Sequence, residues 1–174
     1  MLQIAYTLTE EEFLDYNYYM CWQRPEKRKH RMLFSIVFPI FFVIGISVLL
    51  YIWDGQLTVF SILLSCLMGI ILHLLVRFRM KPAFDKNAKK LLKKPGGETI
   101  LAPAELLINE EGITGTKKTL AVKYQWKAFI GKTINLNCYY LFINFNQAMV
   151  IPFRAFKDAA EKEKCESIVD QYLL

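Results

Sequence analysis

One long stretch of the sequence lacks charged residues, whereas a soluble protein would distribute them along the whole chain. Charged residues make up 22% of the 174 positions, yet residues 33–76 hold only one of them, Asp54. This segregation excludes an ordinary soluble domain over that stretch and is typical of membrane proteins. The start of the chain also lacks the early basic residues and apolar core of a cleavable signal peptide. We therefore expect the first apolar helix to act as the insertion signal.

Close cysteine pairs and catalytic motifs are lacking as well. The four cysteines form no CxxC or other close pair, which argues against a disulfide framework or a zinc site. His30 and His73 have no Asp, Cys or Ser at a hydrolase or metal spacing, and the paired Glu110 and Glu111 lie on a predicted turn. No phosphate-binding glycine loop or metalloprotease motif occurs. We predict a protein that is not an enzyme, with no catalytic residue, cofactor or metal.

Two uncharged apolar runs occupy residues 33–53 and 57–76. A helix of about 20 residues covers roughly 30 Å, the thickness of a bilayer's hydrocarbon core. Only Asp54, Gly55 and Gln56 separate the runs, so two such helices must be antiparallel neighbours. Neither run has the polar face of a helix that packs in a soluble core. The pattern predicts a transmembrane hairpin.

Particular residues are expected to shape this hairpin. Pro39 removes one helical hydrogen bond and should bend the first helix. Ser61, Ser65 and Gly69 recur every four residues, so they share one face on which the two backbones can approach closely. His73 lies near the membrane edge, and without a carboxylate partner it is weak evidence for a proton or ion path.

Lysine and arginine flank both runs and are missing from the link between them. The positive-inside rule then places both chain ends in the cytoplasm. Anionic lipid headgroups explain the net charge of +6 better than nucleic acid does, because the positive charge gathers beside the apolar runs. The flanking residues are Arg24, Lys27, Arg28, Lys29 and Arg31 before the first run, and Arg77, Arg79 and Lys81 after the second.

Residues 1–32 are predicted to form a cytoplasmic strand and helix. Alternating apolar residues over positions 2–8 indicate the strand. Thr9 and Glu12 fit a capping box at the start of a helix that ends near Met20.

Residues 77–97 are predicted to form a basic juxtamembrane helix and linker, which ends at Pro95-Gly96-Gly97. Two interpretations stay open for the helix. It either lies along the lipid headgroups or continues the second membrane helix with a solvated lysine face.

Residues 98–174 show the pattern of a small antiparallel β domain closed by a C-terminal helix. Alternation from Leu120 to Ala128 predicts a half-buried strand in which Trp126 and Tyr124 face the core. The remaining predicted elements are strands at 105–109, 113–116, 138–144 and 148–152, a hairpin turn at Glu110-Glu111-Gly112 with the glycine in a left-handed conformation, and a final helix capped by Asp158 and Glu161. This outline is that of a pleckstrin-homology-like (PH-like) barrel.

Lysines provide the candidate binding surface. Some follow the second apolar run, and others lie on or beside the polar face of the Trp126 strand, where they can meet anionic phospholipid headgroups or an acidic partner. An ordinary solvated face is the alternative. Arg154 could pair with a carboxylate of the terminal helix or with a ligand. The candidate lysines are Lys86, Lys89, Lys90, Lys93, Lys94, Lys117, Lys118, Lys123 and Lys127, with Lys132 beyond them.

Several stretches in order resemble the YcxB-like bacterial membrane proteins over essentially the whole chain. They are IAYTLTEEEF, the two apolar runs, NEEGITG, the strand with Trp126, and VIPFRAF. The resemblance implies a bacterial cytoplasmic-membrane protein whose residues 98–174 form a domain related to PH folds, and it brings no catalytic residues.

We therefore expect a membrane α+β protein that does not bind nucleic acid. Its cytoplasmic PH-like domain would act as an interaction or regulatory module for anionic membrane lipids or an unidentified protein partner, and a homo-oligomer is compatible with this. The alternative function is immunity, that is, self-protection against a membrane-active or secreted toxin.

Overall fold

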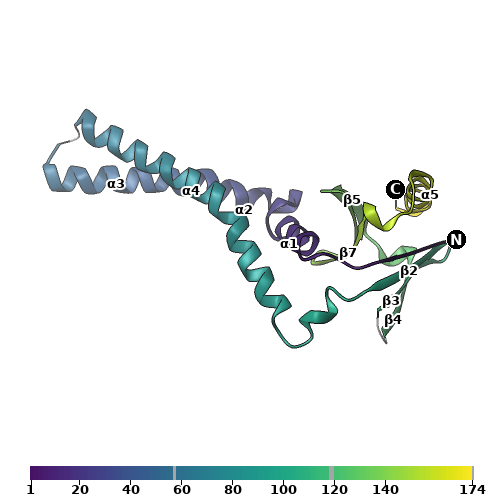
Figure 1. The fold of residues 1–174 in the computed structure, drawn as a ribbon. Helices are drawn as coiled ribbons and strands as arrows, with labels where there is room; N and C mark the ends of the chain where they lie inside the picture. The colour runs from purple at the N-terminus through teal and green to yellow at the C-terminus, as the bar shows by residue number, and fades with distance from the viewer. Residues whose placement is uncertain (57, 118–119, 174) are drawn as a thin grey trace. The chain divides into compact units, whose positions relative to one another are not determined.

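The computed structural model describes residues 1–56, 58–117 and 120–173 (Figure 1). Two positions that carried expectations, Leu57 at the start of the second apolar run and the candidate Lys118, lie outside these residues. The chain divides into two compact units. One comprises Met1–Tyr16 and Ala88–Leu174, and the other comprises Asn17–Asn87.

The unit at Asn17–Asn87 is helical and is dominated by two long apolar helices. A short helix, α2 (Arg28–Met32), leads through a π-helical turn at Leu33–Val37 into α3 (Phe38–Asp54). Pro39 is the second residue of α3, and because the helix runs on from the π-helical turn, its missing N–H leaves the Ser35 carbonyl without a donor four residues ahead. The helix α4 (Val59–Leu92) begins in this unit and runs 34 residues without a break, with Pro82 inside it.

Local hydrogen bonds define the turn between α3 and α4. Gly55 has a φ of +70° and its N–H bonds to the Tyr51 carbonyl at 2.9 Å, the C-terminal arrangement that glycine favours. Thr58 and Ser61 then cap α4 reciprocally, each backbone N–H bonding to the other's hydroxyl at 3.1 Å. The turn falls where the sequence predicted it, although α3 includes Asp54 and the Thr58 cap was missed.

The continuity of α4 agrees with one interpretation of the juxtamembrane segment, continuation of the second apolar helix. Residues 77–92 continue the second apolar helix, which ends before the Pro95-Gly96-Gly97 linker. Pro82 does not end the helix, although it removes one hydrogen bond from it.

The other unit contains seven strands in two antiparallel sheets. One sheet has the order β1-β2-β3-β4 and the other β5-β6-β7. The strands are β1 (Leu2–Tyr6), β2 (Ala104–Asn109), β3 (Gly112–Lys117), β4 (Leu120–Gln125), β5 (Gly131–Asn135), β6 (Cys138–Asn144) and β7 (Gln147–Pro152). The helix α1 (Glu10–Tyr18) follows β1, and α5 (Ala159–Tyr172) ends the chain. The N-terminal strand thus joins the C-terminal β region, pairing with β2 from Leu2 opposite Ile108 to Tyr6 opposite Ala104.

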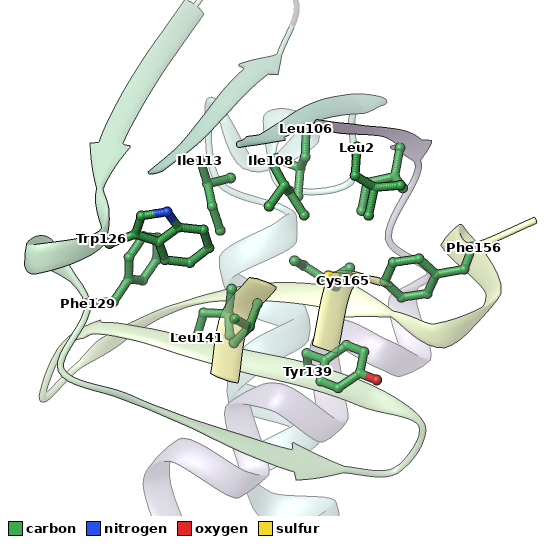
Figure 2. Close-up of a cluster of buried hydrophobic side chains, with 13 residues drawn as sticks. Leu2, Leu106, Ile108, Ile113, Trp126, Phe129, Tyr139, Leu141, Phe156 and Cys165 are labelled. Atoms are coloured by element: carbon green, nitrogen blue, oxygen red, sulfur yellow. The ribbon is translucent and has the colours of Figure 1, made fainter. Parts of the chain in front are cut away.

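One hydrophobic core lies between the two sheets and α5. Figure 2 shows labelled side chains of β1, β2 and β3 converging with Leu141 of β6 and Cys165 of α5. Ile108, Ile113, Leu141 and Ile151 are fully buried. Alternation places Leu2 and Ile4 of β1 and Leu106 and Ile108 of β2 in this core, because every second residue of a strand faces the same side.

Trp126 is buried as expected, but its assignment to a strand is wrong. β4 ends at Gln125, and Trp126–Ala128 forms a single 3₁₀ turn closed by a bond from the Phe129 N–H to the Trp126 carbonyl at 3.0 Å. Trp126 and Phe129 both point into the core, a spacing that strict alternation would not allow (Figure 2). The turn carries the chain from one sheet to the other.

Three predicted turn and capping motifs are present. Glu12 and Thr9 form the capping box of α1, and Asp158 accepts a bond from the Glu161 N–H at 2.7 Å at the start of α5. The Glu110-Glu111 turn also lies where expected. Gly112 differs in detail, since its φ is +151° and a Cβ there would lie 2.0 Å from the Tyr124 carbonyl oxygen.

Candidate functional site

The two apolar helices carry an exposed hydrophobic surface that a soluble protein would not leave uncovered. Both Pro25–Asp54 and Val59–Leu92 are long and apolar enough to cross a membrane. Only 6% and 17% of the residues in their most apolar stretches are buried. A core helix of a soluble protein would be mostly buried, so this surface needs another apolar environment.

Small residues of α4 let α3 approach closely, as the sequence predicted. Ser65 is fully buried, and its hydroxyl donates to the Ser61 carbonyl at 2.9 Å, so no polar group is left unsatisfied there. A Cβ added to Gly69 would lie 2.3 Å from Cγ2 of Val43 on α3. Glycine at position 69 is therefore required by the packing of the pair.

His73 joins the two helices by a contact that the sequence analysis did not foresee. Its Nδ1 lies 2.5 Å from the carbonyl oxygen of Ser35. A carbonyl oxygen only accepts, so Nδ1 carries the proton and donates. Ser35 lies four residues before Pro39, whose nitrogen has no hydrogen to offer that carbonyl. A proline in one apolar run and a histidine in the other were the available signal.

An apolar groove runs along the α3–α4 pair beside this contact. Its volume is about 560 Å³. Almost every atom of the lining is apolar, and the titratable side chains in it are Cys66 and His73. The groove is lined by Ser35, Ile36, Pro39, Ile40, Val43, Ile44, Cys66, Gly69, Ile70 and His73.

Arg31 and aromatic rings hold the start of the first apolar helix. The Arg31 guanidinium donates to the carbonyls of Trp22 and Arg24 at 2.5 and 2.9 Å. The Trp22 ring lies 5.9 Å from Phe84 of α4 and 6.4 Å from Phe34. Aromatic side chains beside basic ones are typical of the boundary between a membrane and water.

The candidate lysines are dispersed, and several have protein partners. Lys89 pairs with Glu10 at 3.0 Å, and Lys123 forms an ion pair with Glu111. Lys117 donates to the Ile100 carbonyl at 2.7 Å, and partial burial lowers the pKa of its amine. The exposed members of the set are Lys86, Lys89 and Lys90 of α4, Lys93 and Lys94 just after it, Lys123 of β4 and Lys127 of the 3₁₀ turn. Lys132 pairs with Asp170 of α5.

Arg154 has a partner at the other end of the chain. Its Nε and a terminal nitrogen both donate to the Glu12 carboxylate at 2.7 Å, and that nitrogen also donates to the Thr7 carbonyl. Partial burial alone would raise the pKa of Glu12, but the bonds from Arg154 and Thr9 outweigh it and hold that pKa below its usual value. The sequence analysis had offered a carboxylate of the terminal helix or a ligand as the partner of Arg154, and the structure gives it Glu12 of α1.

The two thiols of the β unit are structural. Cys138 and Cys165 are buried, and burial raises their pKa values to about 11 and about 12. A thiol with a raised pKa is a poor nucleophile. Within the described ranges, no group of three or more His, Cys, Asp or Glu residues is arranged to hold a metal ion.

Residues 108–166 match the family model of the YcxB-like proteins. The YcxB-like region begins in β2, covers β3 to β7 and ends in α5. It contains the segments NEEGITG and VIPFRAF, which carried the resemblance in the sequence. No curated protein and no solved structure gives a significant match to the chain.

Proposed function

We propose that this protein is a membrane-anchored, non-enzymatic interaction module. In it, α3 and the apolar part of α4 cross the bilayer as a hairpin, and the YcxB-like β unit serves as a cytoplasmic PH-like domain at the inner membrane face. The exposed apolar surface of the two helices carries the proposal, because a bilayer would cover it without loss of any hydrogen bond.

Charge and turn chemistry support the orientation with both ends inside. Basic residues lie before α3 and after the apolar part of α4, while the connection at Gly55–Thr58 has none among its described residues. Trp53, which is 91% exposed, lies beside that connection, where aromatic anchors meet the far headgroups.

Topology is tested by single cysteines introduced at Gln56 and Glu163 in a chain whose own exposed cysteines are replaced by serine. In intact cells, a membrane-impermeant maleimide should label position 56 only. Labelling of position 163 from outside would overturn the proposed orientation. Extraction of the chain by alkaline carbonate would overturn membrane insertion itself.

The exposed lysines near the end of α4 support a second part of the proposal, namely that they keep the β unit close to anionic lipid. Each such lysine near an anionic leaflet contributes about 1 kcal/mol, and the effect fades within a Debye length of roughly 10 Å. The test replaces Lys86, Lys90, Lys93 and Lys94 with Gln and measures the distance from a fluorophore on the β unit to nanodisc lipid. Lys127→Gln is the single-site control, and an unchanged distance at low and high salt would reject this step.

A further inference from the structure

We propose that the groove between α3 and α4 is a binding site for one anionic phospholipid, with an acyl chain in the groove and the phosphate at its basic end. The inference rests on the proposed membrane insertion and adds to it a defined site, a ligand class and a residue that selects the ligand.

The dimensions and lining of the groove fit an acyl chain. About 560 Å³ lies within the range of small-molecule sites in proteins. Ile36 of the π-helical turn and Ile40 and Ile44 of α3 form one wall, and Cys66 and Ile70 of α4 form the other. The polar atoms of Ser35 and His73 lie together at one end, so the ligand must be apolar for most of its length and polar at one end.

The helix register places a cation beyond the polar end. Cys66, Ile70 and His73 line the groove, and Arg77 follows them at the same helical spacing, so it lies on the same face of α4. Arg77 is exposed, and no carboxylate in the described part of the chain forms an ion pair with it. The positive charge of Arg77 therefore makes this end of the groove complementary to an anionic group.

His73 adds a second polar contact, to a hydroxyl of the headgroup. Its Nδ1 donates to the Ser35 carbonyl, which fixes the ring and leaves Nε2 as an acceptor for a ligand hydroxyl. A zwitterionic lipid would bring a cationic headgroup to Arg77, whereas phosphatidylglycerol brings a phosphate without one. Charge complementarity thus selects an anionic phospholipid over a zwitterionic one.

The test uses the full chain in nanodiscs of phosphatidylcholine with a small fraction of phosphatidylglycerol, whose acyl chain carries a photoactivatable group. We expect crosslinks to concentrate on Ile40, Cys66 and Ile70. Arg77→Gln should reduce them about five-fold, the effect of one cation near an anionic headgroup. Arg79→Gln is the matched control, because residues two apart on a helix do not share a face. Cys66→Phe should fill the groove and abolish the crosslinks, while the neighbouring Leu67→Phe should not.

Three outcomes would overturn the lipid site. They are equal labelling of all faces of both helices, equal labelling by a phosphatidylcholine probe, and indifference to Arg77→Gln. A disulfide between Cys66 residues of two copies, formed with loss of lipid labelling, would assign the groove to a second copy instead. Carbonate extraction of the same membranes separates these results from a failure of the proposed function, which would remove the chain from the bilayer altogether.

Discussion

His73 of α4 donates a hydrogen bond to the carbonyl oxygen of Ser35, the carbonyl to which Pro39 cannot donate. An unsatisfied carbonyl is costly in an apolar environment, so the histidine offsets the cost that the proline introduces. The hydrogen bond from His73 thus links the two apolar helices, and this role explains the histidine without an ion path.

The hydrogen bond between His73 and the Ser35 carbonyl predicts that substitutions at His73 and Pro39 are coupled energetically. His73→Leu should destabilise the hairpin by about 1 kcal/mol, a usual value for a hydrogen bond between membrane helices. In a Pro39→Ala background the same change should cost less, because the new N–H can reach the Ser35 carbonyl along the helix. A double-mutant cycle by unfolding in mixed micelles, read by energy transfer between labels on α3 and α4, checks this. Equal losses in both backgrounds would contradict it.

Substitution by alanine should destabilise the hairpin at one of its glycines and not at another. Gly69→Ala brings a Cβ to 2.3 Å from Cγ2 of Val43, and Val χ1 is stiff in a helix, so the pair should separate at a cost of about 1–3 kcal/mol. Gly45→Ala meets nothing within 4 Å and should be neutral or slightly stabilising. Disulfide trapping between α3 and α4 measures the separation. Val43→Ala should rescue Gly69→Ala, and a failure to do so would place the clash elsewhere.

Regular patterns made most of the fold predictable from the sequence. The length of the apolar runs, the spacing of Ser61, Ser65 and Gly69, and the Thr9–Glu12 capping box are local signals, and each has its counterpart in the structure. Trp126 shows where this reasoning fails. Trp126 and Ala128 happen to continue the alternation of apolar residues past Gln125, so the sequence predicted a longer strand. In the structure the chain turns at these residues to reach the second sheet.

The candidate site was less predictable, because it depends on pairs that are distant in the sequence. Lys123 with Glu111, Arg154 with Glu12 and His73 with Ser35 come together only through the fold. Nothing in the local sequence distinguishes the paired Lys123 from the exposed Lys127. The positions of charged residues predicted a basic protein, but not which charges remain available to a ligand.

Trp126 should be the side chain of the β unit most sensitive to truncation. It is 6% exposed, stacks on Tyr172 with ring centroids 5.1 Å apart, and donates from Nε1 to the Asn109 carbonyl at 2.9 Å. Trp126→Ala should destabilise the unit by roughly 3–5 kcal/mol, and Trp126→Phe by less, since it keeps most of the buried area. Chemical denaturation followed by near-ultraviolet circular dichroism gives the values. Leu136→Ala, at a 60% exposed position, is the control and should change little.

The Arg154–Glu12 pair predicts a specific acid sensitivity of the β unit. The folded-state pKa of Glu12 lies below its usual value, so its ionised form stabilises the folded state above the unfolded-state pKa. That contribution is lost as the pH falls below about 5 and through the folded-state pKa. Glu12→Gln keeps a side chain that can close the capping box, and so removes mainly the charge. At neutral pH it should cost about 1 kcal/mol or less, because the Arg154 side chain is 48% exposed.

The difference between wild type and Glu12→Gln should therefore be present at neutral pH and disappear in acid. Free energies of unfolding measured from pH 7 to pH 3 test the sign as well as the size. Glu11→Gln, one residue away on α1, should run parallel to the wild type over the whole range. A Glu12→Gln curve that also runs parallel to the wild type would show that the carboxylate has the same pKa in both states. The bidentate contact would then orient the two side chains without an electrostatic contribution to the free energy of unfolding.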